Sequence, residues 1–302
     1  MQSAQQIVQY LEDAGFRAAF LPISAMEQVR EHYDTMLERG PDTKWLRDAI
    51  ARFRSNQPPK PGFEPRSILV AACPCAGAKL VLHIARGRAL EIPIPPGYVD
   101  VSKIRRRMEE TLRRAEGYQT GEIRGISLKL LAVLSGLGQY GRNNICYVGD
   151  WGGYCRLEAC YTDVPCEEPI RQELRMEACE ACGLCQKACP TGAIGEQQVI
   201  DAARCVCHLN EHKARMPRWV PGDVHHTLIG CMRCQECCPQ NPPMVTDYTL
   251  ELDEAETRRL LSRGRKLSGA LKEKFLAFGY EKWAMPRLKR NARLAARAKG
   301  WS

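Results

Sequence analysis

The sequence contains no long hydrophobic run. No stretch reaches roughly 18 consecutive apolar residues, the length at which a membrane-spanning helix is suspected. The first residues, MQSAQQIVQYLEDAGF, have the pattern of an amphipathic helix and lack the basic region and apolar core of a secretory signal. We therefore expect a cytoplasmic protein without a membrane partner.

The sequence also lacks an internal repeat of fixed period and any low-complexity tract. Both absences argue against a repeat architecture and against a disordered chain. The hydrophobic content of 44% is sufficient for packed cores. A length of 302 residues allows two compact domains, or one domain with a smaller module attached.

Acidic residues are fewer than basic ones, which leaves a formal charge of +9. The excess is gathered in two places: Lys103, Arg105, Arg106 and Arg107, and then Arg287, Lys289, Arg290, Arg293, Arg297 and Lys299. Such clusters attract polyanions, although most charge runs are solvated helix faces.

Hydrophobic periodicity predicts a mixture of helices and strands. Helices are expected over residues 3–14, 25–38, 43–55 and 100–116, and again after Pro243; strands are expected in FRAAFLP, SILVAACP, KLVLHIA and ALEIPI, with a proline-rich connection at 56–65. Residues 127–149 combine an apolar helix, a glycine-rich loop and a strand.

The glycine-rich loop contains Gly136, Gly138 and Gly141. Glycines allow a backbone to approach a ligand closely. Their G-x-G-x-x-G spacing is not a dinucleotide signature, because the loop follows a helix and precedes a strand, which is the reverse of the required order.

Sixteen cysteines in a chain of this size, without an export signal, indicate metal ligands rather than disulfides. Cys179, Cys182, Cys185 and Cys189, followed by Pro190, form C-x2-C-x2-C-x3-C-P. In bacterial two-cluster ferredoxins this run gives three ligands to one [4Fe-4S] cluster and its fourth to the other. A second motif is therefore required downstream.

The stretch CMRCQECCPQ supplies that second motif, and one upstream cysteine completes the set. We assign one cluster to Cys179, Cys182, Cys185 and Cys238, and the other to Cys205, Cys231, Cys234 and Cys189. Cys237 is an alternative to Cys238, but the following proline favours Cys238. Structural zinc and unmetallated thiols are the competing interpretations, and neither requires the C-x3-C-P ending.

Core packing is expected for the remaining cysteines, Cys73, Cys75, Cys146, Cys155, Cys160, Cys166, Cys207 and Cys237.

A pair of clusters passes single electrons, so the cluster-binding module needs an electron acceptor. The acceptor is either another protein or a cofactor held by the residues that precede the clusters.

The order of these motifs resembles the epoxyqueuosine reductase family, cobalamin-dependent iron-sulfur enzymes related to reductive dehalogenases. The resemblance runs from YLEDAGFRAAFLP to FLAFGYEKWAMPRLKRNARLAARA and includes AVLSGLGQYGRNN, TDVPCEEP, PTGAI and GCMRCQECCP. The family pattern reads approximately A-G-L-G-W-x-G-K-N. In this chain the glycines and Asn143 match it, Arg142 replaces the lysine and Gln139 replaces the tryptophan.

The resemblance implies an α+β fold. Residues 1–168 would form a cobalamin-binding domain with a mixed sheet flanked by helices, 169–245 a two-cluster ferredoxin-like module, and 246–302 a basic helical segment. Gly136, Gly138, Gly141, Arg142 and Asn143 would then contact the cobalamin. Glu122, fourteen positions before Gly136, takes the place of the family's proposed proton-donating aspartate. An ordinary exposed acid is the alternative for Glu122.

The resemblance also implies an external electron donor of ferredoxin or flavodoxin type, and tRNA as a candidate partner. A tyrosine-histidine pair of the family is absent, since this chain reads YVDVSKIRRR there, and we expect a member without the family's C-terminal helical repeats. Another substrate, or a corrinoid carried by a partner protein, therefore ranks level with tRNA. Two further hypotheses are an electron-transfer protein without an organic cofactor, and a nucleic-acid-binding protein with structural clusters.

Overall fold

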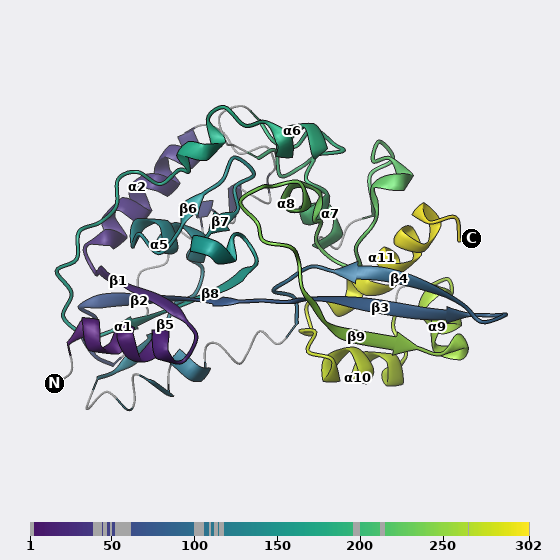
Figure 1. Ribbon diagram of the computed structural model, residues 1–302, viewed down its shortest axis with the longest axis horizontal. Helices are drawn as coiled ribbons and strands as arrows, with labels where there is room; N and C mark the ends of the chain where they lie inside the picture. Colours follow the sequence, from purple (N-terminus) through teal and green to yellow (C-terminus); the bar gives the residue numbers. More distant parts are fainter. Residues whose placement is uncertain are drawn as a thin grey trace. The chain divides into compact units, whose positions relative to one another are not determined.

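The computed structural model describes residues 3–38, 44, 47–48, 50–51, 62–99, 106–108, 110–111, 114, 118–195, 200–211, 215–264 and 266–301 (Figure 1). Most of the proline-rich connection, parts of the expected helices at 43–55 and 100–116, and the basic residues Lys103 and Arg105 lie outside these ranges. The described residues alternate between helices and strands, which confirms the α+β class.

The chain divides into two compact units, each built from separate stretches. The first comprises Met1–Pro74, Ser102–Cys182 and Glu196–Ala202, and the second comprises Cys75–Val101, Gly183–Gly195 and Ala203–Ser302. This division differs from the three consecutive segments expected from the sequence. The strand pair that follows Pro74 belongs to the same unit as the C-terminal helices.

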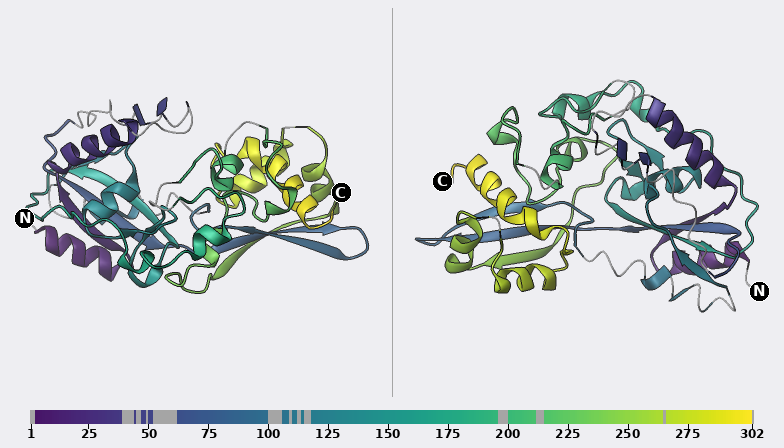
Figure 2. Two further views of the ribbon diagram at one scale, coloured as in Figure 1. Left: turned by 90° about the horizontal axis from the view of Figure 1, so that it is seen from above. Right: turned by 180° about the vertical axis from the view of Figure 1, so that it is seen from behind.

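A four-stranded sheet forms the centre of the first unit. Its order is β1 (Arg17–Pro22), β2 (Ser67–Pro74), β8 (Cys155–Thr162) and β5 (Thr120–Glu122). Each neighbouring pair is antiparallel. Helices α2 (Ala25–Glu38) and α5 (Leu128–Leu134) lie on one side of the sheet, and α1 (Ala4–Asp13) lies on the other (Figures 1 and 2).

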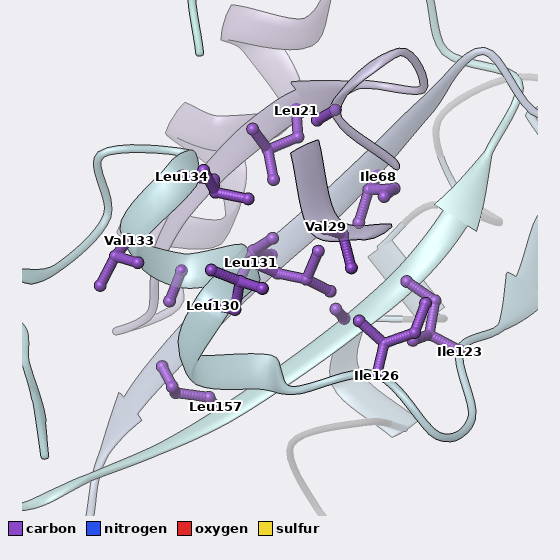
Figure 3. Packing of buried hydrophobic residues seen from close by; sticks show 14 of the residues in the cluster. Leu21, Val29, Ile68, Ile123, Ile126, Leu130, Leu131, Val133, Leu134 and Leu157 are labelled. Atoms are coloured by element: carbon purple, nitrogen blue, oxygen red, sulfur yellow. The ribbon is translucent and has the colours of Figure 1, made fainter. Parts of the chain in front are cut away.

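Strand β2 explains why the first unit has helices on both faces. Successive side chains of a strand point to opposite faces. Ile68, Val70 and Ala72 therefore pack with α2 and α5, whereas Leu69 and Ala71 pack with α1. Figure 3 shows Leu130 and Leu131 of α5 in the first of these two cores. The uninterrupted apolar run SILVAACP is thus required by a strand buried on both faces.

A three-stranded mixed sheet forms the centre of the second unit. Its order is β4 (Arg88–Ile94), β3 (Gly77–Ile84) and β9 (Thr246–Leu252); β3 pairs antiparallel with β4 and parallel with β9. The expectation of helix directly after Pro243 is wrong for β9. Leu250 and Leu252 of β9 point into the core, and the residue between them is exposed, as the two-residue period of a strand requires. Two apolar positions are too few to show this period clearly in the sequence.

Three helices complete the second unit: α9 (Glu254–Leu261), α10 (Gly269–Ala277) and α11 (Met285–Ala298). Helix α9 packs against β3 and β9, and α11 packs against β4 and α9 (Figure 1). Leu288 of α11 and Phe275 of α10 are fully buried with Leu80 and Leu82 of β3.

The basic residues of α11 are bound largely to the chain itself. Arg290 donates to the carbonyl oxygens of Leu209 and Asn210 at 2.9 and 2.7 Å, and Arg293 donates to those of Ser262 and Gly264 at 2.7 and 3.1 Å. Further donors are Lys289 to Ser262, Arg287 to Trp283 and Lys299 to Glu91. Holding the fold together is a third use for this charge cluster, beside solvation and polyanion binding.

The short elements carry most of the predicted site residues. They are β6 (Gln139–Tyr140), β7 (Cys146–Tyr147), α6 (Leu184–Ala188), α7 (Val206–Glu211), α8 (Arg233–Glu236), and the 3-10 turns Gly149–Trp151, Glu177–Cys179 and Gly222–Val224. None of the described helices is long and apolar enough to cross a membrane.

Candidate iron-sulfur site and the glycine loop

The first cysteine run passes from one unit to the other. Cys179 ends the 3-10 turn Glu177–Cys179, and both it and Cys182 belong to the first unit. In the second unit, Cys185 is buried within α6 and Cys189 caps the carboxyl end of that helix. Pro190 follows, where a residue without a backbone N–H does no harm to the finished helix.

The second cysteine run surrounds the short helix α8. Cys231 precedes the helix, Cys234 lies within it, Cys237 caps it and Cys238 follows. Helices α6 and α8 pack against each other within the second unit (Figure 1). Two C-x2-C helices packed together are the arrangement that the ferredoxin-type spacing predicts.

Four predicted ligands of one cluster converge from three separate stretches of the second unit. The pKa of Cys234 is raised by burial first, and then by the neighbouring thiols of Cys231, Cys205, Cys185 and Cys189. Burial raises the pKa of Cys231 to about 11, again with Cys205 and Cys189 contributing. Sulfur atoms that oppose one another's ionisation lie close together, and a bound metal would displace their protons.

Backbone N–H groups already point at several of these sulfur atoms. Ala193 N–H donates to Cys189 Sγ at 3.2 Å. Backbone donors from Cys207 and His208 act on Cys205, and one from Arg233 acts on Cys231. Such bonds favour a thiolate that carries the charge of a cluster, so the donor set fits the predicted [4Fe-4S] group.

His226, beside the second motif, has hydrogen-bond partners within the chain. Met232 N–H donates to His226 Nε2 at 3.4 Å, so the opposite ring nitrogen, Nδ1, carries the proton and donates to the Val224 carbonyl at 3.0 Å. His226 is therefore part of the scaffold that precedes α8. Across the described ranges, no three or more His, Cys, Asp or Glu side chains are arranged to hold a single metal ion.

Cys207 lies two residues after a predicted ligand but faces a different set of groups. Its thiol donates to Glu211 Oε1 at 3.2 Å, and Tyr98 OH also donates to that oxygen. Burial raises the pKa of Cys207 well above its ordinary value. Core packing, the expectation for this cysteine, agrees with its surroundings.

Two glycines of the glycine loop are required by close packing. A Cβ on Gly138 would lie 2.6 Å from Cys146 Sγ and 2.7 Å from the Tyr147 carbonyl oxygen. A Cβ on Gly141 would lie 2.5 Å from Tyr147 Cε2. The space above these glycines is therefore filled by strand β7 of the same hairpin.

Asn143 and Arg142 are also engaged within the chain. Asn143 is buried; its amide donates to Tyr147 OH at 2.9 Å, and its Oδ1 accepts from Ile145 N–H at 3.2 Å. Arg142 extends to the first cysteine run, where its guanidinium donates to the carbonyl oxygens of Cys179 and Glu180. The loop residues that the resemblance assigns to a cofactor thus order the hairpin and hold the segment at Cys179.

Glu122 lies at the end of β5, opposite Cys160 of β8. Its Oε2 accepts from Arg124 Nη2 at 2.6 Å, with 40% of the Glu122 side chain and 78% of the Arg124 side chain exposed. The carboxylate raises the pKa of Arg124 through this hydrogen bond and its charge. This exposed placement is the one that the exposed-acid alternative describes.

The remaining cysteines of the first unit include two that are buried, Cys146 and Cys160. Burial raises the pKa of Cys146 to about 12. Cys73, Cys155 and Cys166 are half-buried.

Sequence reasoning missed the contact between Arg142 and Cys179, because no local pattern joins residues 37 positions apart.

Comparison with known proteins covers both the cysteine-rich region and the whole fold. Residues 178–241 match the model of the 4Fe-4S double cluster binding domain. The epoxyqueuosine reductase of Bacillus subtilis (strain 168) is 30% identical over 132 residues, which are 44% of this chain and 33% of that protein. The match therefore spans about a third of that relative's length.

Solved structures of similar fold extend the likeness over the whole chain. The crystal structure of a selenomethionine-labelled epoxyqueuosine reductase has a TM-score of 0.68 at 20% identity and covers 97% of this chain and 81% of that one. An epoxyqueuosine reductase in complex with an epoxyqueuosine-modified tRNA-Tyr stem loop has a TM-score of 0.63 at 19% identity, covering 97% and 80%.

The fold and the converging thiols define a class: an α+β protein with a double 4Fe-4S cluster binding region in its C-terminal half. Within that class, the chain is epoxyqueuosine reductase-like in sequence and in fold.

Proposed function

We infer that this chain is an iron-sulfur oxidoreductase that passes single electrons through two [4Fe-4S] clusters. Cys179, Cys182, Cys185 and Cys238 would hold the first cluster, and Cys189, Cys205, Cys231 and Cys234 the second. The observation that carries the inference is the packing of α6 against α8 within the second unit, which brings together the helices that carry Cys185 and Cys234. The ferredoxin-type spacing and the double cluster match support both sets.

Cobalamin is the electron acceptor that the resemblance suggests. The contacts of the glycine loop within the chain do not require that role, because atoms of β7 meet the Cβ positions of Gly138 and Gly141 and because Arg142 and Asn143 bind within the chain. Glu122, the corresponding proton donor, is paired with Arg124. Cobalamin dependence and these site residues stay predictions, and we derive no reaction step through the corrinoid.

The alternative is a ferredoxin-type protein that reduces a partner or the partner's corrinoid, without an organic cofactor of its own. The internal contacts of the glycine loop favour this alternative. An external donor of ferredoxin or flavodoxin type would load the clusters in either case.

Metal analysis of anaerobically purified protein, incubated with cobalamin and then desalted, tests both versions. We expect about eight irons per chain, because each [4Fe-4S] cluster contributes four. One cobalt per chain, with a corrinoid visible spectrum, would support a cobalamin-dependent reductase. Eight irons without cobalt would support the electron-transfer protein. Fewer than about four irons, or stoichiometric zinc, would contradict the proposal of two clusters.

A tRNA stem loop is the proposed substrate, on the example of the relative solved with such an RNA. Exposed cations would make phosphate contacts, whereas Arg290 and Arg293 are already bound to the chain's own carbonyl groups. We expect affinity for a fluorescent tRNA stem loop to fall steeply between 50 and 200 mM salt, as phosphate-dependent binding does. Fluorescence anisotropy measures it, with a DNA hairpin of equal length as the control. Binding that is absent or insensitive to salt would exclude this substrate.

A further inference from the structure

The hairpin of β6 and β7 runs beside the segment that leads into the first cysteine run. Tyr140 N–H donates to the Leu174 carbonyl at 2.7 Å, and Met176 N–H donates to the Tyr140 carbonyl at 3.0 Å. Tyr140 and Arg175 thereby form a parallel bridge. Two residues beyond Tyr140, the tip of the hairpin reaches Cys179 within the same unit.

The tip of the hairpin is a tight turn that fixes the position of Arg142. Gly141 N–H donates to the Ile145 carbonyl at 2.9 Å, and Asn144 N–H donates to the Gly141 carbonyl at 2.9 Å. Asn144 has a φ of 58°, a left-handed conformation that asparagine tolerates in turns. Lys129 Nζ also donates to the Asn144 carbonyl at 2.7 Å. The backbone of Arg142 is therefore held before any cluster binds.

Arg142 contacts Cys179 with both its backbone and its side chain. Its backbone N–H donates to Cys179 Sγ at 3.4 Å. Its guanidinium donates from Nη2 to the carbonyl oxygens of Cys179 at 2.6 Å and Glu180 at 3.0 Å, and from Nε to that of Cys179 at 3.2 Å. The rigid planar fork of arginine suits two adjacent acceptors better than a lysine ammonium would.

The N–H donor to Cys179 Sγ comes from a residue that is distant in the sequence. Ala193, which donates to Cys189, and Arg233, which donates to Cys231, each lie within four positions of their cysteine. Arg142 lies 37 positions before Cys179. The first cysteine run therefore takes a sulfur donor and a fixed positive charge from a distant hairpin.

Hydrogen bonds to sulfur and the net charge nearby set the reduction potential of an iron-sulfur cluster. Reduction adds one electron, and hence one negative charge, to the cluster. A guanidinium and an N–H dipole at Cys179 stabilise the reduced form more than the oxidised form. Both contacts therefore raise the potential of the cluster that Cys179 holds.

We propose that Arg142 is a positioning residue that raises the reduction potential of the first [4Fe-4S] cluster by fixing a backbone donor and a positive charge at Cys179. The proposal rests on the proposed cluster ligation. It gives Arg142 a role toward the cluster, in place of the corrinoid contact that the resemblance implies.

An EPR-monitored redox titration with dithionite, performed anaerobically on the full chain, tests the proposal. In Arg142→Ala we expect one midpoint potential to fall, so that the ratio of reduced to oxidised cluster at the wild-type midpoint drops about tenfold, which is ~59 mV for a one-electron couple. The other midpoint potential should not change. Arg142→Lys, which keeps the charge but loses the planar fork, should give a smaller fall.

Arg175→Ala is the matched control, because it removes an exposed arginine four residues before Cys179. We expect both of its midpoint potentials to equal those of the wild type. An equal fall in Arg175→Ala would assign the effect to general charge and overturn the proposal. Unchanged potentials in Arg142→Ala, with only a lower melting temperature, would reduce Arg142 to a structural residue and overturn it as well.

A further variant keeps the test decisive if the alanine protein fails to bind iron. Arg142→Gln keeps a hydrogen-bond donor without the charge, and the same single potential should fall; unchanged potentials would overturn the proposal. Iron analysis of the wild type distinguishes a failure of the proposed function from a failure of the role proposed for Arg142. A wild type without clusters refutes the proposed function, whereas clusters whose potentials ignore Arg142 refute only the role given to this residue.

Discussion

Replacing Cys205 with alanine is expected to remove one of the two clusters and to lower the iron content from about eight to about four per chain. Burial raises the pKa of Cys205, and the neighbouring Cys189 thiol raises it further. The Cys205 thiol also contributes to the raised pKa values of Cys231 and Cys234. Without this ligand the second set keeps three thiols, so iron analysis and the visible absorption of the anaerobic protein should both fall by half.

Cys207→Ala is the matched control, two residues away in helix α7, which begins directly after Cys205. The Cys207 thiol donates to Glu211 beside Tyr98, so it is engaged away from the cluster ligands. We expect its iron content to stay at about eight. Equal iron loss in both variants would mean that the whole helix, rather than the Cys205 sulfur, supports the cluster. Loss in Cys207→Ala alone would make Cys207 the ligand.

Full iron content in Cys205→Ala would contradict the assignment in another way, because it would make Cys205 an ordinary core thiol. Electron paramagnetic resonance of the reduced protein then identifies which cluster is missing. In a protein with both clusters, neighbouring spins couple and broaden the spectrum, whereas a single remaining cluster gives an uncoupled signal. We expect the uncoupled signal in Cys205→Ala.

The sequence was sufficient for features that depend on spacing within one segment. The run from Cys179 to Cys189 predicts a divided ligand set because its spacing is that of two-cluster ferredoxins. SILVAACP predicts a buried strand, and strand β2 is buried on both faces. Helix α1 follows from its apolar spacing, and its residues Ile7 and Leu11 are buried.

Features that depend on pairing between distant segments could not be predicted in this way. Strand β9 was missed because TDYTLEL is exposed along most of its length and becomes a strand only by pairing with β3. The make-up of the second unit likewise depends on distant pairing, since strands β3 and β4 join helices that begin more than 150 residues later. The contact between Arg142 and Cys179 also depends on distant segments, because the two residues are 37 positions apart.

The glycine loop illustrates the limit of a motif as evidence for a ligand. A glycine is required wherever backbone approaches closely, whether the neighbour is a cofactor or the chain itself. Gly138 and Gly141 approach strand β7, so the pattern is already explained by the hairpin. The same hairpin then presents Arg142 to the first cysteine run.

Gly138→Ala is expected to lower the free energy of unfolding of the first unit by about 1–3 kcal/mol, the usual cost of forcing extra atoms into a packed site. The new Cβ would lie 2.7 Å from the Tyr147 carbonyl oxygen, which is backbone of the paired strand and cannot rotate away. It would also lie 2.6 Å from Cys146 Sγ, whose thiol is buried in the same core. Urea unfolding of the cluster-loaded protein, followed by circular dichroism, measures the loss.

Gly222→Ala provides the control, because a Cβ there meets nothing within 4 Å and the residue has no left-handed φ. Its free energy of unfolding should stay within about 0.5 kcal/mol of the wild type, as for most surface substitutions. If Gly138→Ala were equally harmless, strand β7 would have room to move away and the loop could open toward a ligand. In that case close packing against β7 would no longer explain Gly138, and the cofactor contact that the resemblance implies would be the remaining explanation for this glycine.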